Sequence, residues 1–308
     1  MYVLFFGVVI HFSCSNESNL SIEEVHLDQS DSARNAYTVI IPGKEPFKAV
    51  LYLLPGLGET AEYVMQQTSL PLIAAENGFL TIIPTLQDGV LSMGVDSVGQ
   101  QCLKLLMQDV NERFLLTNPE YVIGGFSIGG SIAIKYAGNS KDKPAAVFGI
   151  DPPLDFERYY FAATRNLRIS NNDAAKQENL FMIEQLEKLT GGSPENYHSE
   201  YLKLSPFAHN DTTQHKIHSL IHVPLRLYSE PDIEWWMSER GLDYYSLNGL
   251  DCAALVNELN LLEAEQAKLI ISTNKGYREP GHKRHPHSWS IADADDLVQW
   301  LNASLIRK

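Results

Sequence analysis

Residues 124–130, GGFSIGG, decide the fold class of this chain. They contain G-x-S-x-G centred on Ser127, a pattern that is weak in isolation. Here it directly follows an apolar strand at 121–123 and directly precedes a helix at 128–137. In that setting a serine hydroxyl projects above a sheet, and glycines stand where side chains would collide with the turning backbone. The following helix aims its N-terminal amides at the hydroxyl, so Ser127 is the candidate nucleophile.

Strands alternate with helices on both sides of this turn. The run 49–54 is apolar throughout, which indicates a strand buried on both faces, as in a parallel sheet covered by helices. The alternation predicts an α/β fold with a mainly parallel central sheet. Strands are expected at 24–27, 36–41, 49–54, 79–83, 121–123, 145–150, 224–228 and 268–272, and helices at 60–77, 98–115, 128–137, 252–264 and 291–306.

The alternation stops between residues 151 and 219. This stretch is aromatic and polar, holds a clear helix at 179–190 and has no strong strand. A structureless loop of that length is implausible in a compact domain, so we expect a helical cap inserted at 154–219. The core would then comprise 22–153 and 220–308, after a leader at 1–21.

The charge and cysteine content of the chain argue against several classes of function. The 308 residues are 44% hydrophobic and carry a formal net charge of -14, which argues against nucleic acid as a partner. The three cysteines are too few for a disulfide framework and form no CxxC pair for zinc.

The leader contains an apolar run at 2–12 followed by Ser13 and Cys14, and it resembles a bacterial lipoprotein signal. We expect export to the periplasm or its membranes, with lipid on Cys14. Two features depart from that pattern, since His11 replaces an aliphatic residue and no Lys or Arg precedes the run. The alternatives are a hydrophobic first strand or an export segment cleaved elsewhere.

A serine hydroxyl attacks a carbonyl only when a base removes its proton, and a carboxylate must orient that base. After an elbow of this kind the acid comes next along the chain and then the histidine. The strand at 224–228 runs into a loop that holds Asp232, and this segment resembles the part of α/β-hydrolases in which a strand is followed by a short loop ending in the acid, so Asp232 is favoured. Glu230 is a local rival, and Asp151, after the preceding strand, is a weaker one. Asp232 could instead cap a helix at 233–236.

Three histidines, His282, His285 and His287, lie in the loop before the last helix. His287 is the favoured base, with His282 as the alternative. Such a cluster could also bind a metal, but no second group of Cys, Asp or Glu at ligand spacing accompanies it. No metal is therefore expected.

Ser127, Asp232 and His287, in this order on alternating strands and helices, resemble the α/β-hydrolase superfamily over 36–306 apart from the cap. The dipeptide after His287 ends in a tryptophan just before the last helix, which is similar to a common ending in that family. The match is most specific at the elbow.

The segment 54–58, LPGLG, is similar to the His-Gly-x-Gly loop of the same family, with Pro55 replacing the histidine. By that match the amides of Leu57 and Ile128 would hold a developing oxyanion. The alternative is a plain glycine-containing turn.

The resemblance implies a serine hydrolase that needs no cofactor and forms an acyl-enzyme on Ser127. A carboxylic ester of a small or medium apolar molecule is the favoured substrate, because aromatic residues crowd the cap and the segment after Asp232. The same aromatics could simply pack the cap onto the core. A peptidase for short peptides and an anchored, non-catalytic binding protein remain the alternatives.

Overall fold

The computed structural model describes residues 20–27, 31 and 33–306. Over these residues the core is an eight-stranded sheet in the order β1-β2-β4-β3-β5-β6-β7-β8. The pairs β1–β2 and β2–β4 are antiparallel, and all later pairs are parallel. The strands are β1 Ser21–His26, β2 Ala36–Ile41, β3 Ala49–Leu54, β4 Phe79–Thr85, β5 Tyr121–Phe126, β6 Ala146–Ile150, β7 Leu225–Ser229 and β8 Ala267–Ile271, with a separate hairpin of β9 Tyr277–Arg278 and β10 Lys283–Arg284.

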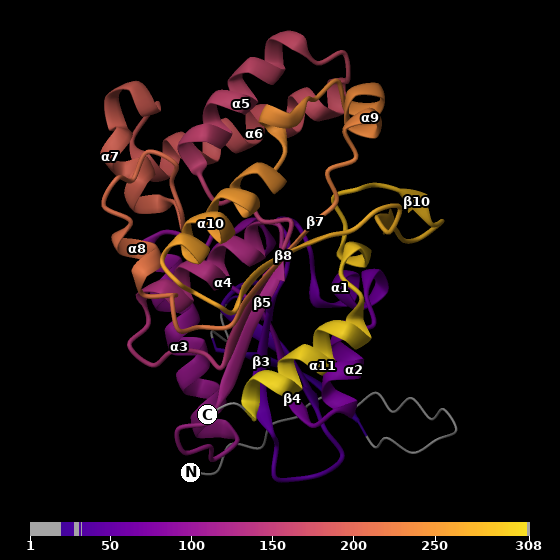
Figure 1. Ribbon diagram of the computed structural model, residues 1–308. Helices are drawn as coiled ribbons and strands as arrows, with labels where there is room; N and C mark the ends of the chain where they lie inside the picture. Colours follow the sequence, from indigo (N-terminus) through magenta and orange to yellow (C-terminus); the bar gives the residue numbers. More distant parts are fainter. Residues whose placement is uncertain (1–19, 28–30, 32, 307–308) are drawn as a thin grey trace.

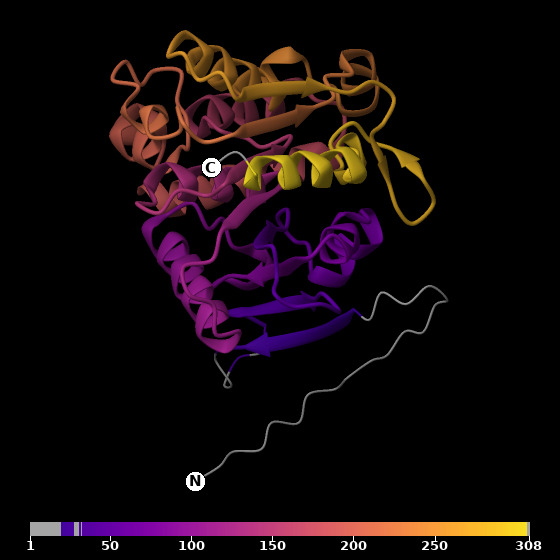
Figure 2. The same cartoon turned by 60° about the horizontal axis from the view of Figure 1, so that its bottom comes forward.

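Helices cover both faces of the sheet (Figures 1 and 2). One core cluster joins the sheet to α3, α4 and α10, and the other joins it to α1, α2 and α11. The strands β3 and β5, at the centre of the sheet, are buried along their whole length, as the unbroken apolar run predicted. The core helices are α1 Ala61–Gln67, α2 Leu70–Glu76, α3 Ser97–Arg113, α4 Ile128–Asn139, α10 Gly249–Leu261 and α11 Ala294–Leu305, with the 3-10 turns η1 Gly89–Leu91 and η4 Trp289–Ile291.

The helix expected at 60–77 is two helices. Thr60 caps α1 by accepting a hydrogen bond from the backbone of Tyr63. The chain then leaves helical geometry at Thr68, whose backbone is extended, and α2 begins with Pro71 in its first turn. Proline fits a first helical turn but removes an amide donor from a helix interior, so the sequence favours a break at this point.

Two segments form a cap above the carboxyl ends of the strands (Figure 1). The first lies between β6 and β7, within the expected insertion. The second lies between β7 and α10, and the sequence did not predict it. The cap elements are α5 Phe156–Ile169, α6 Asp173–Thr190, α7 Pro194–Leu204 and α8 His215–His218, followed by α9 Ile233–Trp235, η2 Trp236–Arg240 and η3 Tyr244–Ser246.

Polar contacts join the two cap segments. The hydroxyl of Ser170 donates to the backbone oxygen of Arg240 at 2.7 Å, and that of Ser246 donates to Asn166 at 3.0 Å. A partly exposed ion pair of 2.8 Å links Arg165 to Asp243. The second segment is therefore held against the first and forms part of the same cap.

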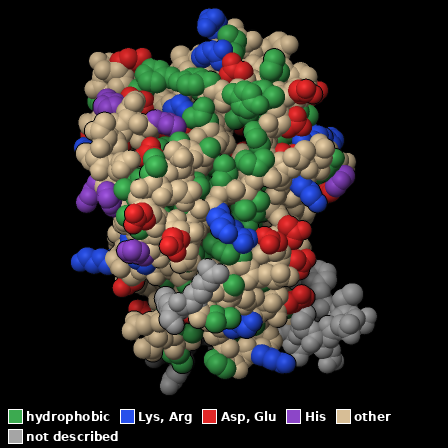
Figure 3. Space-filling view, in the orientation of Figure 1, with side chains coloured by type: hydrophobic (Ala, Val, Ile, Leu, Met, Phe, Trp, Pro, Cys, Tyr) green, Lys and Arg blue, Asp and Glu red, His purple; other side chains and the backbone are tan. Residues whose placement is uncertain are grey.

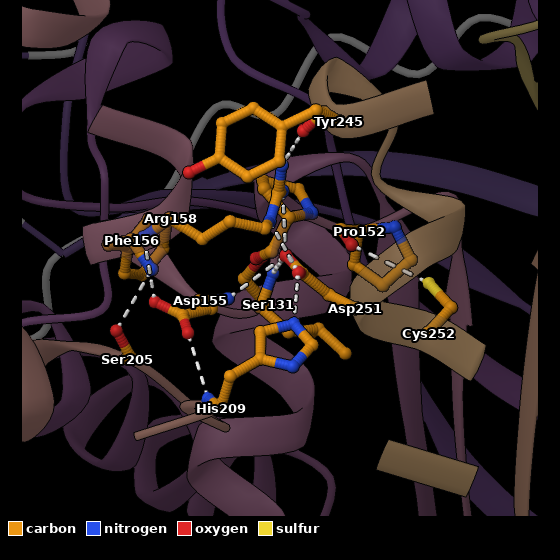
Figure 4. Close-up of polar contacts among 12 residues, drawn as sticks. Ser131, Pro152, Asp155, Phe156, Arg158, Ser205, His209, Tyr245, Asp251 and Cys252 are labelled. Carbon is orange, nitrogen blue, oxygen red and sulfur yellow. Dashed lines mark hydrogen bonds and ion pairs between the residues drawn. The ribbon is translucent and has the colours of Figure 1, made fainter. Parts of the chain in front are cut away.

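A buried charge network fixes the cap to the core (Figure 4). Arg158 of α5 donates from Nε and Nη2 to the carboxylate of Asp251 in α10, at 2.5 and 2.8 Å. Asp251 is fully buried and also accepts from two backbone amides and lies 3.0 Å from the His209 ring. A carboxylate with this many donors remains ionised despite its burial, and its pKa lies below the ordinary value.

The outer surface of the cap carries apolar side chains (Figure 3). Phe161, Leu180, Met237 and Tyr244 are each more than a third exposed. Among the described residues no helix is both long and apolar enough to span a bilayer. The predicted lipidation residue, Cys14, lies outside the described residues.

Candidate active site

Ser127 occupies a strained turn between β5 and α4. Its backbone has φ +52° and ψ -126°, a left-handed conformation that a side-chain-bearing residue adopts only under constraint. A Cβ on either Gly125 or Gly129 would lie 2.2 Å from the carbonyl oxygen of Leu54. The close passage of β3 beside the turn therefore requires both glycines of the G-x-S-x-G pattern, and the strain directs the Ser127 side chain out of the sheet.

The structure brings Ser127 and His287 together, as predicted. The His287 Nε2 lies 3.0 Å from the Ser127 hydroxyl oxygen, and its Nδ1 lies 2.7 Å from the Asp151 carboxylate. Asp151 is buried and directly follows β6, with φ +48°. The hydroxyl of Ser229, at the end of β7, donates to its other oxygen at 2.8 Å. One imidazole thus bridges a hydroxyl and a carboxylate.

The expectation that Asp232 orients the histidine is wrong. Its carboxylate lies 2.5 Å from the guanidinium of Arg284 and accepts the backbone hydrogen bond that caps α9. The two aspartates belong to neighbouring parallel strands, whose carboxyl ends meet at one edge of the sheet. Asp151 adjoins its strand directly, whereas Asp232 lies three residues beyond the end of β7.

Glu230, the local rival for the acid, holds the histidine loop. It is 3% exposed and directly follows β7. Its carboxylate accepts hydrogen bonds from the Ser272 hydroxyl and from the backbone amides of Lys275 and Gly276, and it pairs with Arg284. The loop that carries His287 is thereby tied to the end of the sheet.

The three histidines of this loop make separate contacts. His282 lies 2.9 Å from Glu279 and stacks on Tyr277 at the surface, away from Ser127. His285 accepts a hydrogen bond from Arg240 at 3.0 Å. In the part of the chain that the structure describes, no three His, Cys, Asp or Glu side chains converge in a way that could hold a metal ion.

The loop after β3 lies beside the serine turn. Leu57 and Ile128 line the same cavity as Ser127. Ile128 is the first residue of α4, where an amide has no partner within the helix. The half-buried Glu59 accepts hydrogen bonds from the Gly56 amide at 2.8 Å and the Trp289 indole at 3.0 Å, both on Oε2. Burial raises the pKa of Glu59. These bonds tether the Gly56–Leu57 turn to the segment that follows His287.

A cavity of about 450 Å³ opens over Ser127, between the sheet and the cap. Its volume is in the range of small-molecule sites. Tyr159, Phe181 and Met182 from the first cap segment form an apolar wall. Arg240 from the second segment and Arg278 from the β9–β10 hairpin also line the cavity.

The fold has many counterparts among solved structures. An S-formylglutathione hydrolase from Agrobacterium tumefaciens superposes with a TM-score of 0.60 at 14% identity, covering 96% of this chain and 99% of that one. The fluorophosphonate-binding serine hydrolase F of Staphylococcus aureus gives 0.54 at 14% identity over 94% and 99%. A lipase in its open form gives 0.54 at 12% identity over 94% and 97%. This chain has the α/β-hydrolase fold. No family model matches the sequence, and no curated protein matches it.

Within the α/β-hydrolase fold, sequence reasoning placed the serine and histidine but ranked the acid wrongly. The available signal for Asp151 was its position immediately after an apolar strand, in the sequence Asp-Pro-Pro. Glu59, Arg240 and Arg278 were not singled out. Each lies in a different part of the chain, and only the fold shows that all three line one cavity.

Proposed function

We propose that the chain is a serine hydrolase that cleaves a carboxylic ester through an acyl-enzyme on Ser127. The observation that carries this proposal is the hydrogen-bonded series of Ser127, His287 and Asp151, at 3.0 and 2.7 Å. The likeness to solved hydrolases supports the fold on which such chemistry is common, and the side-chain geometry supports the chemistry.

In the proposed mechanism His287 Nε2 accepts the proton of Ser127 as the hydroxyl oxygen attacks the ester carbonyl. Asp151 accepts from His287 Nδ1, which selects the tautomer that leaves Nε2 free and stabilises the imidazolium that forms. His287 then protonates the leaving alcohol. Water releases the acyl group by the same steps in reverse order.

The amides of Leu57 and Ile128 are the proposed donors to the tetrahedral oxyanion. Amides fixed in advance stabilise developing charge without reorganising, and removing one donor from such a site costs about 10²–10³ in kcat. Glu59 contributes indirectly because it holds the Gly56 amide and therefore the turn that presents Leu57.

Labelling with a fluorophosphonate probe tests the nucleophile. We expect one probe per chain, found on Ser127 by peptide mass spectrometry and absent from Ser127→Ala. Absence of label from the folded wild-type protein would favour a non-catalytic binding protein.

A substrate panel tests the reaction class. Short p-nitrophenyl esters are compared with aminoacyl p-nitroanilides of similar size. Hydrolysis of the esters alone supports the proposed esterase. A higher kcat/KM for the anilides would instead assign a peptidase.

A further inference from the structure

The cavity over Ser127 contains two guanidinium groups that the proposed reaction does not use. Arg240 belongs to η2 in the second cap segment, and Arg278 belongs to the β9–β10 hairpin. Both line the cavity that holds Ser127 and His287. Arg240 donates a hydrogen bond to His285, and the charges of both arginines act on that imidazole.

Arg278 is held by a neutral group. Its Nε and Nη2 both donate to the backbone oxygen of His287, at 3.1 and 2.8 Å. Within the described residues no carboxylate forms an ion pair with it, although the charges of Glu178 and Glu59 act on it from farther away. Burial lowers the pKa of Arg278. The Arg278 side chain is half-buried, lines the cavity and keeps donor capacity beyond the backbone oxygen of His287, so an anionic ligand could add a charge-assisted hydrogen bond to it.

Among the described residues, Arg240 forms one long ion pair with an exposed carboxylate. Its Nη2 donates to His285 Nε2 at 3.0 Å, and Glu178 lies 3.7 Å from its Nη1 with a side chain 63% exposed. Burial, together with the nearby charges of Arg278 and Arg240, lowers the pKa of His285 to about 2. His285 is therefore a neutral acceptor and does not compete with an anion for the guanidinium.

The other carboxylates around the cavity are already engaged. Asp151 is bound by His287 and Ser229, Glu230 by Arg284 and the histidine loop, and Glu59 by Gly56 and Trp289. Glu178, which is largely in water, lies 3.7 Å from the guanidinium of Arg240, and its charge also acts on Arg278. Four carboxylates and two guanidinium groups line the cavity, and the guanidinium groups of Arg240 and Arg278 are its charged donors for an anion, with an apolar wall beside them.

We propose that the ester substrate carries a carboxylate, which Arg240 and Arg278 bind. A guanidinium presents paired donors that match the two oxygens of a carboxylate. Arg278 is bonded to the backbone of His287 itself, so the anion would lie within a short chain length of the reacting carbonyl. This inference rests on the proposed hydrolase function and names its substrate class as carboxylate-bearing esters.

Two matched ester pairs test the proposal and locate the charge. On the acyl side, mono-p-nitrophenyl adipate is compared with p-nitrophenyl hexanoate, which has the same chain length without the carboxylate. On the alcohol side, 4-acetoxybenzoate is compared with its methyl ester. The measured quantity is the ratio of kcat/KM for the anionic ester to that for the neutral one. We expect one of the pairs to give a ratio of about ten or more, since hydrogen bonds to charged groups are the strong ones.

Variants identify the residues. Arg240→Gln should reduce the favourable ratio by about tenfold, because one of the two guanidinium groups is lost. Glu178→Gln should raise the ratio, since it removes the competing carboxylate. The matched control is Arg226→Gln, because Arg226 pairs with Asp296 and stacks on Trp300 outside the cavity. Added KCl should raise KM for the anionic ester alone.

The outcomes separate this proposal from the one it rests on. Turnover with ratios near one in both pairs would overturn carboxylate recognition and leave the hydrolase intact. If no ester is turned over, the hydrolase proposal fails, and titration calorimetry with adipate then decides the remaining question. Binding to the wild-type protein that weakens in Arg240→Gln supports the anion site, and no binding overturns it.

Discussion

Asp151 and Glu230 divide two tasks at the ends of neighbouring strands. Asp151 contacts His287, while Glu230 holds the loop from which that histidine projects. Both are buried; Asp151 contacts His287 and accepts from Ser229, and Glu230 accepts from Ser272 and two backbone amides. Burying a carboxylate without hydrogen-bond partners costs free energy, and at both positions the fold supplies donors that offset this cost.

Glu59 offers a test of the turn that carries Leu57. In Glu59→Gln the side chain keeps its shape, but the one oxygen that accepts from both Gly56 and Trp289 becomes a neutral amide oxygen, a weaker acceptor than a carboxylate. We expect kcat for ester hydrolysis to fall by about tenfold with little change in KM, because an oxyanion donor is less well placed. Trp289→Phe is the matched control, since Glu59 keeps its bond to Gly56. Equal losses in the two variants would contradict a role through the turn.

Local sequence was sufficient for Ser127 but not for the acid. The elbow is a contiguous strand, turn and helix, so seven residues specify its geometry. The partner of His287 is chosen among carboxylates on two adjacent parallel strands. The choice depends on the distance from each carboxylate to the imidazole and on its distance to Arg284. The order of residues along the chain gives neither distance.

At the scale of the secondary-structure elements, a buried ion pair between α5 and α10 joins the cap to the core. Asp251→Asn leaves Arg158 buried beside a neutral amide. We expect the free energy of unfolding in urea to fall by about 3–5 kcal/mol, the usual cost of removing one partner of a buried ion pair. The control is Asp243→Asn, whose partly exposed pair with Arg165 should contribute less than about 1 kcal/mol. Similar losses in the two variants would show that burial of the network is unimportant.

The same network gives a pH dependence of stability. The hydrogen bond with Asp251 raises the pKa of His209. Because the pKa of His209 is higher in the folded state, the protonated imidazole stabilises the fold fully at pH values below its unfolded-state pKa of about 6.5. This stabilisation is lost as the pH rises through the folded-state pKa. The stability difference between wild type and His209→Gln, from urea unfolding, should therefore shrink from about pH 6 to pH 8. A difference that grows over this range would contradict the assignment.

The sequence predicted the core elements better than the cap. The unbroken apolar run 49–54 is buried at every position in the sheet, and such a pattern can be recognised in the sequence itself. The second cap segment is built from short turns, α9, η2 and η3, and its position depends on contacts with α5 and α6. Such a segment has no strong period of its own, so its place over the active site emerges only in the folded chain.

At the scale of the whole molecule, the chain combines an acidic composition with an apolar outer cap surface. We propose that it is exported and anchored through a lipid on Cys14, on the strength of the sequence pattern alone. Cys14→Ala should abolish incorporation of radiolabelled palmitate in cells and move the protein from the membrane to the soluble fraction. Unchanged fractionation, with no label in the wild-type protein, would contradict the anchor.

The most direct test of the account is the kcat/KM of Asp151→Asn beside that of Asp232→Asn, measured with one p-nitrophenyl ester. Replacing the carboxylate that orients the histidine reduces kcat by about 10⁴ in well-studied serine hydrolases, because the wrong tautomer forms. We expect a loss on the order of 10³–10⁴ for Asp151→Asn and less than about tenfold for Asp232→Asn. The reverse ranking would contradict the assignment of Ser127, His287 and Asp151 as one catalytic unit.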